Sequence, residues 1–204
     1  MRDYSKLIKL AENNNGIIQT KEVVENNIPK DYLHFAVQDK VLEKVKNGIY
    51  ITSDTFIDEF YILQLKSKNL IFSYETAAYF NDLTTRTPLT LSITTTKGNN
   101  VSNIKSNYKL DFHFVPMEKL NLGLTTTKTI YGNLIQIYDR ERTICDMFSR
   151  NYIGDKYVVN ESLKTYLKME DKNLIKLLEY AKLLGVEKKL RDKLEILLWK
   201  HQNN

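Results

Sequence analysis

The fold of this chain is indicated most clearly by residues 16–52, GIIQTKEVVENNIPKDYLHFAVQDKVLEKVKNGIYIT. Two short amphipathic segments are separated by Asn26-Asn27, and two alternating segments then flank Asn47-Gly48. The Asn-Gly pair is a strong hairpin signal because both residues accept positive φ angles. This order predicts a helix, a tight turn, a second helix and a β-hairpin, which is the arrangement of a winged helix-turn-helix.

The second of these helices is predicted to run from Pro29 to about Lys40, with two faces of different character. Leu33, Ala36 and Val37 recur at helical spacing and are expected to pack inward. The opposite face presents Lys30, Asp31, His34, Phe35 and Gln38. Such a face can contact phosphates, base edges and thymine methyl groups, so the segment predicts a helix that enters a DNA groove.

The segments around this helix supply further candidate contacts to DNA. Thr20 is predicted to cap the first helix, with Glu22 in its first turn. We expect Lys30, His34, Phe35 and Gln38 in the major groove, and the following residues on phosphates: Thr20, Lys21, Lys44, Lys46 and Asn47. The same fold also serves as a protein-interaction or structural module, and a charged helix face is usually a solvated one.

Charge is spread unevenly along the chain. The net charge is +5, but residues 1–52 carry 8 Lys/Arg against 7 Asp/Glu, whereas residues 161–204 carry 10 against 7. The predicted DNA-binding segment is therefore barely basic. Its attraction to phosphate must come from the placement of a few side chains.

Composition is that of an ordinary globular protein. The 204 residues suffice for one large or two small domains, with 42% hydrophobic and 27% charged residues. No apolar run approaches the roughly 20 residues of a membrane span, and the first residues lack the features of a secretory signal. Cys145 is a single cysteine and cannot form an internal disulfide, which favours a cytoplasmic location.

The whole chain is predicted to be α+β, with a winged helix-turn-helix domain at 1–53 and a mixed α/β domain at 54–204. LTLSITTTK and YKLDFHFVP alternate as strands do, with a turn at 97–100 between them. A further strand pair is expected about Gly132-Asn133, so that strands occupy 88–138. Helices are expected at 54–66, 74–83, 139–150 and 160–200.

The predicted helices after residue 138 carry clear end signals and apolar stripes. Asp139 is a capping residue, and Arg142 and Asp146 form an i, i+4 pair in the less favourable orientation. Gly185 is placed to end a helix. The stripes, which are expected to pack within their own domain, consist of Leu174, Leu177, Leu178, Ala181, Leu184, Leu190, Leu194, Leu197 and Leu198.

The sequence lacks the common catalytic motifs. It contains no HExxH, CxxC pair, Walker-type glycine loop or GxSxG elbow, and its three histidines lack metal-ligand spacing. Cys145 lies on an apolar helix face, where an inert buried thiol is expected. We predict no enzyme, cofactor or metal. The alternative is a metal-dependent nuclease with a DNA-targeting domain, for which Asp111 in YKLDFHF is the best candidate.

Three stretches resemble the AbiEi antitoxins of bacterial abortive-infection toxin–antitoxin systems. IPKDYLHFAVQDKVLEKVKNGIYIT (28–52) resembles the recognition helix and wing, and IFSYETAAYFNDLT (71–84) resembles a Ser-x-x-Ser/Thr-Ala helix. YDRERTICDMF (138–148) resembles a helix with Arg-Thr-apolar-x-Asp. The chain departs from the family at Lys40, where related sequences often have Gly, and at Asp39, a commonly basic position.

The resemblance implies a transcriptional autorepressor that binds double-stranded DNA at its own promoter, as two copies on repeated half-sites. It also implies an antitoxin that neutralises a nucleotidyltransferase-like toxin without a stable complex between the two proteins. Antitoxicity would come from the C-terminal region.

Overall fold

The chain forms two compact units. The computed structural model describes residues 2–65, 67, 69–104, 106–150 and 152–202, with residues 198–202 described by their backbone alone. This described part contains ten helices and two sheets and ends in helices, which confirms the predicted α+β class. The N-terminal unit is Met1–Ile62 with Lys128–Leu134, and the C-terminal unit is Leu63–Thr127 with Ile135–Asn204. The N-terminal unit thus extends past the predicted boundary at residue 53.

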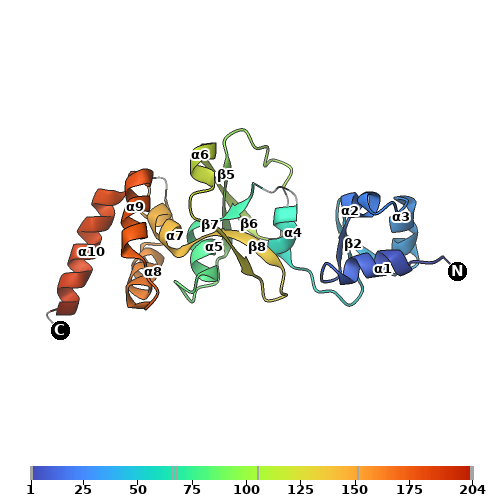
Figure 1. Ribbon diagram of the computed structural model, residues 1–204, viewed down its shortest axis with the longest axis horizontal. Helices are drawn as coiled ribbons and strands as arrows, with labels where there is room; N and C mark the ends of the chain where they lie inside the picture. The colour runs from blue at the N-terminus through green and yellow to red at the C-terminus, as the bar shows by residue number, and fades with distance from the viewer. Residues whose placement is uncertain (1, 66, 68, 105, 151, 203–204) are drawn as a thin grey trace. The chain divides into compact units, whose positions relative to one another are not determined.

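The N-terminal unit consists of helices packed against a three-stranded antiparallel sheet in the order β1-β3-β2. Its elements are α1 (Ser5–Glu12), β1 (Ile17–Gln19), α2 (Thr20–Glu25), α3 (Asp31–Gln38), β2 (Leu42–Lys46) and β3 (Ile49–Thr52) (Figure 1). The core is built from the inward faces of the three helices together with residues of β1, β2 and the connecting segments: Tyr4, Leu7, Ala11, Ile18, Val23, Ile28, Leu33, Ala36 and Leu42.

In this unit the residue that caps α2 differs from the sequence prediction, and α3 spans Asp31–Gln38, two residues shorter at each end than the predicted 29–40. Gln19, and not Thr20, precedes α2 as its capping residue, and its N–H donates to the Glu22 carboxylate over 2.8 Å. Lys40, just beyond α3, has a φ of 57°, and the next N–H donates to the Ala36 carbonyl over 2.8 Å. Lys40 therefore occupies the left-handed position that closes many helices and that glycine fills without strain.

The larger sheet has five strands in the order β6-β5-β4-β8-β7. The elements that form or flank it are α4 (Glu59–Leu65), β4 (Ile71–Phe72), α5 (Tyr74–Phe80), β5 (Thr90–Thr96), β6 (Lys109–Val115), α6 (Met117–Leu120), β7 (Leu124–Lys128) and β8 (Leu134–Tyr138). The predicted turn after β5 is present, since Asn99 N–H donates to the Thr96 carbonyl. However, β5 and β6 pair in parallel, because the chain returns along the sheet before β6 begins.

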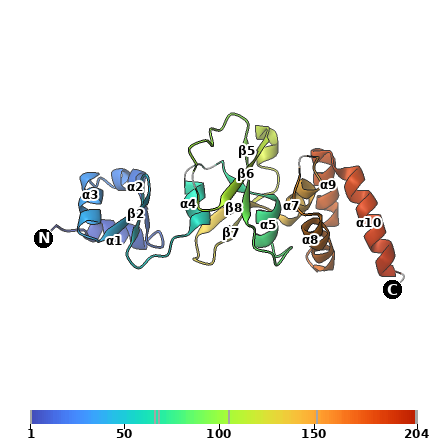
Figure 2. The same cartoon turned by 180° about the vertical axis from the view of Figure 1, so that it is seen from behind.

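The C-terminal unit ends in α7 (Arg140–Met147), α8 (Lys156–Lys168), α9 (Leu174–Leu184) and α10 (Glu187–Gln202). Figures 1 and 2 show α7 between the sheet and the two helices α8 and α9. As predicted, Asp139 caps α7 and Gly185 ends α9. α8 begins earlier than expected because Asp155 caps it.

The predicted apolar stripes are buried to different degrees. Leu177, Ala181, Leu190, Leu194 and Leu197 are buried in the helical core, whereas Leu174 is 36% exposed. The side chains of Leu198 and Trp199 lie outside the described residues. Across the described helices, none combines the length and apolar character needed to cross a membrane.

Candidate nucleic-acid interface

The outer face of α3 carries the residues predicted to meet base edges. Leu33 and Ala36 are buried at 2% and 0% exposure, which fixes the rotation of the helix. His34 and Gln38 consequently lie on the exposed side, and Lys30 is exposed where the helix begins. Imidazole and amide groups can both donate and accept hydrogen bonds, so this face has the chemistry required for contact with base edges.

Phe35 belongs to the predicted set, but one face of its ring is covered. The ring is half-buried against the N-terminal core, and the Arg2 guanidinium carbon lies 3.8 Å from its centroid. Arg2 Nη1 also lies 3.5 Å from Asp39 Oδ2, and the Tyr4 hydroxyl donates to the same carboxylate oxygen over 2.5 Å. Arg2 was not predicted as a site residue, because nothing in its own sequence neighbourhood indicates that it reaches α3.

The β2–β3 hairpin presents its lysines unequally. A β-bulge shifts the register between Lys44 and Lys46, and bulges redirect side chains from the regular alternation of a strand. Lys44 is exposed, whereas Lys46 Nζ lies 3.0 Å from Glu59 Oε2, with side-chain exposures of 20% and 13%. Lys46 is therefore engaged by a carboxylate in this structure.

The start of α2 lies beside the hairpin turn. Thr20 N–H donates to the Gly48 carbonyl over 2.9 Å. Lys21 and Asn47 are both exposed near this junction. The structure therefore brings Thr20 and the turn residues together, although they are far apart in the sequence.

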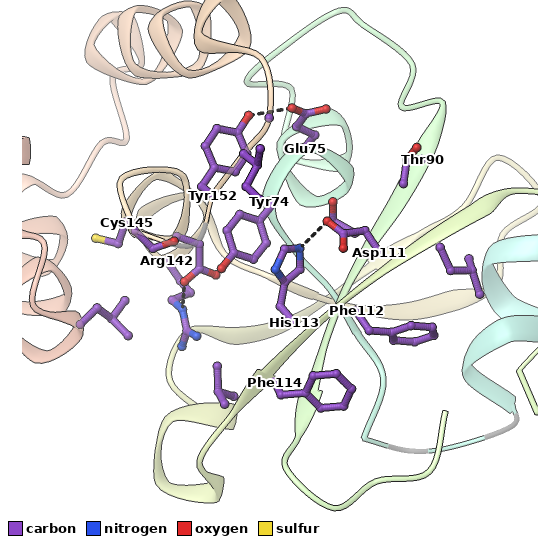
Figure 3. Close-up of a pocket in the computed structure, with 18 of the residues that line it drawn as sticks. Tyr74, Glu75, Thr90, Asp111, Phe112, His113, Phe114, Arg142, Cys145 and Tyr152 are labelled. Atoms are coloured by element: carbon purple, nitrogen blue, oxygen red, sulfur yellow. Dashed lines mark hydrogen bonds and ion pairs between the residues drawn. The ribbon is translucent and has the colours of Figure 1, made fainter. Parts of the chain in front are cut away.

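A second candidate site is a cavity of about 1140 Å³ within the C-terminal unit, between the β5–β6 face and the helices. Figure 3 shows Tyr74, His113, Asp111, Glu75 and Tyr152 around it. The centroid of the Tyr74 ring lies 3.9 Å from that of the His113 ring and 5.7 Å from that of the Tyr152 ring. The Tyr152 hydroxyl donates to Glu75 over 2.7 Å. The cavity thus combines a wall of packed aromatic rings with carboxylate acceptors.

Asp111, the residue of the nuclease alternative, is paired with an imidazole. Its Oδ2 lies 3.2 Å from His113 Nε2, and burial lowers the pKa of His113 while the neighbouring carboxylate opposes that shift. No cluster of three or more His, Cys, Asp or Glu side chains suited to a metal ion occurs among the described residues. The side chain of His201 lies outside them.

The ion pair of Arg142 and Asp146 lines the cavity. Their order along the helix is the less favourable one, so the sequence did not indicate an important interaction. Arg142 Nε donates to Asp146 Oδ1 over 2.8 Å, with side-chain exposures of 1% and 7%. Arg142 also donates to the carbonyls of Lys119 and Leu122 and lies over the Tyr138 ring. Burial raises the pKa of Asp146 to about 6, although Arg142 opposes the shift. Arg142 therefore joins α7 to α6 and to the loop that follows it.

Cys145 lies on the same helix and is fully buried. Its thiol donates to the Leu177 carbonyl at 3.5 Å, and burial raises the pKa of this thiol. A thiol that stays protonated is a poor nucleophile, so the residue has the character of a packing group.

Comparison with known proteins identifies a fold but no family. No family model matches the chain, and no curated protein matches it either. A crystal structure of the RV2827C protein from Mycobacterium tuberculosis is similar, with a TM-score of 0.56 and 11% sequence identity. The match covers 86% of this chain and 71% of that chain. At this identity the likeness is one of fold alone.

Proposed function

We propose that the N-terminal unit is a winged helix-turn-helix domain that binds double-stranded DNA. In this proposal α3 enters the major groove and the β2–β3 hairpin lies on the flanking backbone. The observation that supports it is the division of α3: Leu33 and Ala36 are buried in the core, while His34 and Gln38 remain exposed. A helix held in this way presents donors and acceptors on a rigid support.

The contacts divide into two groups. Lys30, His34 and Gln38 form the groove-facing set together with the free edge of Phe35, while Thr20, Lys21, Lys44, Lys46 and Asn47 serve the backbone. Lys46 must leave Glu59 to take part. The unit as a whole carries 9 Lys/Arg against 10 Asp/Glu, so bulk charge does not attract DNA to it. Binding depends on where the cations lie.

We further propose, from the resemblance to AbiEi antitoxins, that the protein represses its own operon and neutralises a nucleotidyltransferase-like toxin. Two copies would bind repeated half-sites in the promoter. The C-terminal unit would supply antitoxicity without a stable complex, and the protein would act in the cytoplasm. The similar α+β fold of the mycobacterial protein carries no function to this chain.

Repression can be tested with a reporter gene placed behind the DNA that precedes this chain's own gene. We expect the wild-type protein to lower expression and the His34→Ala/Gln38→Ala variant to restore it, because both side chains lie on the exposed face of α3. Lys164→Ala is a matched control, since Lys164 is exposed on α8 in the other unit. Equal repression by all three proteins would refute the assignment of α3.

Antitoxicity is tested separately, by expressing the product of the adjacent downstream gene with and without this protein. Growth arrest relieved by the wild-type chain is the expected result. Relief should persist in the His34→Ala/Gln38→Ala variant, because the proposal assigns neutralisation to the C-terminal unit. A downstream product that is not toxic would remove the antitoxin half of the proposal.

A further inference from the structure

The residues that precede α1 are fixed against α3. Tyr4 is 9% exposed, packs edge-on against Tyr32 with ring centroids 6.3 Å apart, and donates its hydroxyl to Asp39. Arg2 lies two residues away, so its position is set by this anchor. Its guanidinium is held from two sides, by the Phe35 ring at 3.8 Å and by Asp39 at 3.5 Å.

The charge around the C-terminal end of α3 determines how strongly a cation there affects the approach of DNA phosphates. The helix itself contains Asp31 but no Lys or Arg, and at its C-terminal end Asp39 follows directly, with the exposed Lys40 next to it. The helix dipole adds partial negative charge at that end. A polyanion approaching this part of α3 would therefore be repelled unless a neighbouring cation offsets the charge.

Arg2 is well placed to offset it. Its side chain is 47% exposed even though it contacts both Phe35 and Asp39. Exposed ion pairs of this kind contribute little to stability, so the fold does not need Arg2. A planar guanidinium stacked on an aromatic ring still directs free N–H groups outward, and these groups match phosphate geometry.

We propose that Arg2 is a DNA-contacting residue that binds a backbone phosphate beside the C-terminal end of α3. Phe35 then acts as the platform that orients this guanidinium and does not stack on a base. The inference rests on the proposed DNA-binding function, and it adds a residue from outside the helix-turn-helix segment to the interface.

The test measures the affinity of the full chain for its own upstream DNA across a range of salt concentrations, with any purification tag at the C-terminus. Arg2→Ala should lower the slope of log K against log salt by about 1 and weaken binding roughly tenfold at 0.1 M salt. Arg2→Lys should retain the slope while losing part of the affinity, because it keeps the charge but not the planar stacking group.

The matched control is Arg191→Ala. Arg191 is 52% exposed and pairs with Glu187 at 2.9 Å in α10 of the other unit, so this change removes the same kind of charge elsewhere. Its slope should equal that of the wild type. If the wild type binds DNA and Arg2→Ala has the same slope as the wild type, the proposed role of Arg2 is overturned while the proposed DNA-binding function stands. A wild type that binds no DNA would overturn the proposed function and this inference together.

Discussion

Lys44 and Lys46 lie two residues apart in the hairpin, yet their surroundings give them different roles. Lys44 is exposed, whereas Lys46 is paired with Glu59 at 3.0 Å and is mostly shielded from solvent. We expect Lys44→Ala to lower the slope of log K for DNA binding against log salt concentration by about 1. Lys46→Ala should lower this slope by less, because Lys46 must leave Glu59 to reach a phosphate, and should also destabilise the fold by about 1 kcal/mol, because Glu59 loses this partner in a half-buried site.

Each of the two lysine variants serves as the control for the other, since both remove one positive charge from the same hairpin. Salt titrations of DNA binding and urea unfolding should be run on both proteins. Equal losses of slope would show that Lys46 leaves Glu59 on DNA and contacts phosphate as directly as Lys44 does.

The sequence predicted which residues occupy the outer face of α3, but not which of them have other partners. Helical spacing was enough to separate Leu33 from His34. The partners of Phe35 and Lys46 are Arg2 and Glu59, which lie 33 and 13 positions away in the chain. Local periodicity carries no information about such contacts, so their roles required the folded structure.

Lys40 occupies a backbone conformation that is unfavourable for its residue type. Its φ of 57° lies in the left-handed region, which is unfavourable by about 1–2 kcal/mol for residues with a Cβ atom. Lys40→Gly should therefore be more stable than Lys40→Ala by about 1 kcal/mol, even though both variants lose the same charge. Thermal and urea unfolding of the two variants measures this difference. Equal stability would show that the helix end relaxes away from the left-handed conformation.

At the scale of elements, α7 makes stability depend on pH. Burial raises the pKa of Asp146 to about 6, above the ordinary value of 3.8, so the folded state binds a proton more tightly than the unfolded chain. The resulting stabilisation is complete below about pH 4 and is lost as the pH rises through 6. The contribution of Asp146 to the unfolding free energy should therefore fall by about 2–3 kcal/mol over this interval.

Asp146→Asn removes this titration while keeping an oxygen that can accept from Arg142. Its unfolding free energy should lack that decline, so the difference between the two proteins should change by about 2–3 kcal/mol between pH 4 and pH 7. Urea unfolding at several pH values measures it, and contributions from the other carboxyl groups cancel in the comparison. Parallel pH profiles would show that Asp146 is not the buried group that titrates.

Elements with strong local signals were predicted well, and those defined by distant partners were not. The Asp139 cap and the Gly185 stop are local features, and both were confirmed. The parallel pairing of β5 with β6 depends on the path of the chain between them, which strand alternation does not specify. The burial of Arg142 likewise depends on carbonyl groups about 20 residues away.

At the scale of the whole molecule, the N-terminal unit is built from two separate stretches of chain. Asp58 is 1% exposed and accepts hydrogen bonds from Thr129 over 2.5 Å and from Asn133 over 2.8 Å. Asn133 also accepts from Asn15 over 2.9 Å. Residues 128–134 therefore complete the unit that begins the chain, which the predicted boundary at 53 did not anticipate.

Loss of this connection should destabilise the N-terminal unit. Asn133→Ala removes a donor from the buried Asp58 carboxylate and should lower the local stability by about 1–3 kcal/mol. Amide hydrogen exchange should then show faster exchange across residues 16–52. Asn103→Ala, at an exposed asparagine, is the control and should leave exchange unchanged. Unaltered protection in Asn133→Ala would show that the 128–134 segment contributes nothing to the unit.

Sequence-specific binding to DNA through α3 is tested most directly by fluorescence anisotropy on two duplexes, the chain's own upstream DNA and a scrambled sequence. The wild type should bind the upstream duplex at least about 1000-fold more tightly than the scrambled one. The His34→Ala/Gln38→Ala variant should lose that preference while keeping the weak, salt-dependent binding that both duplexes share. Equal affinity of the wild type for both duplexes, or a preference that survives in the variant, would contradict the assignment of α3 as the helix that recognises DNA.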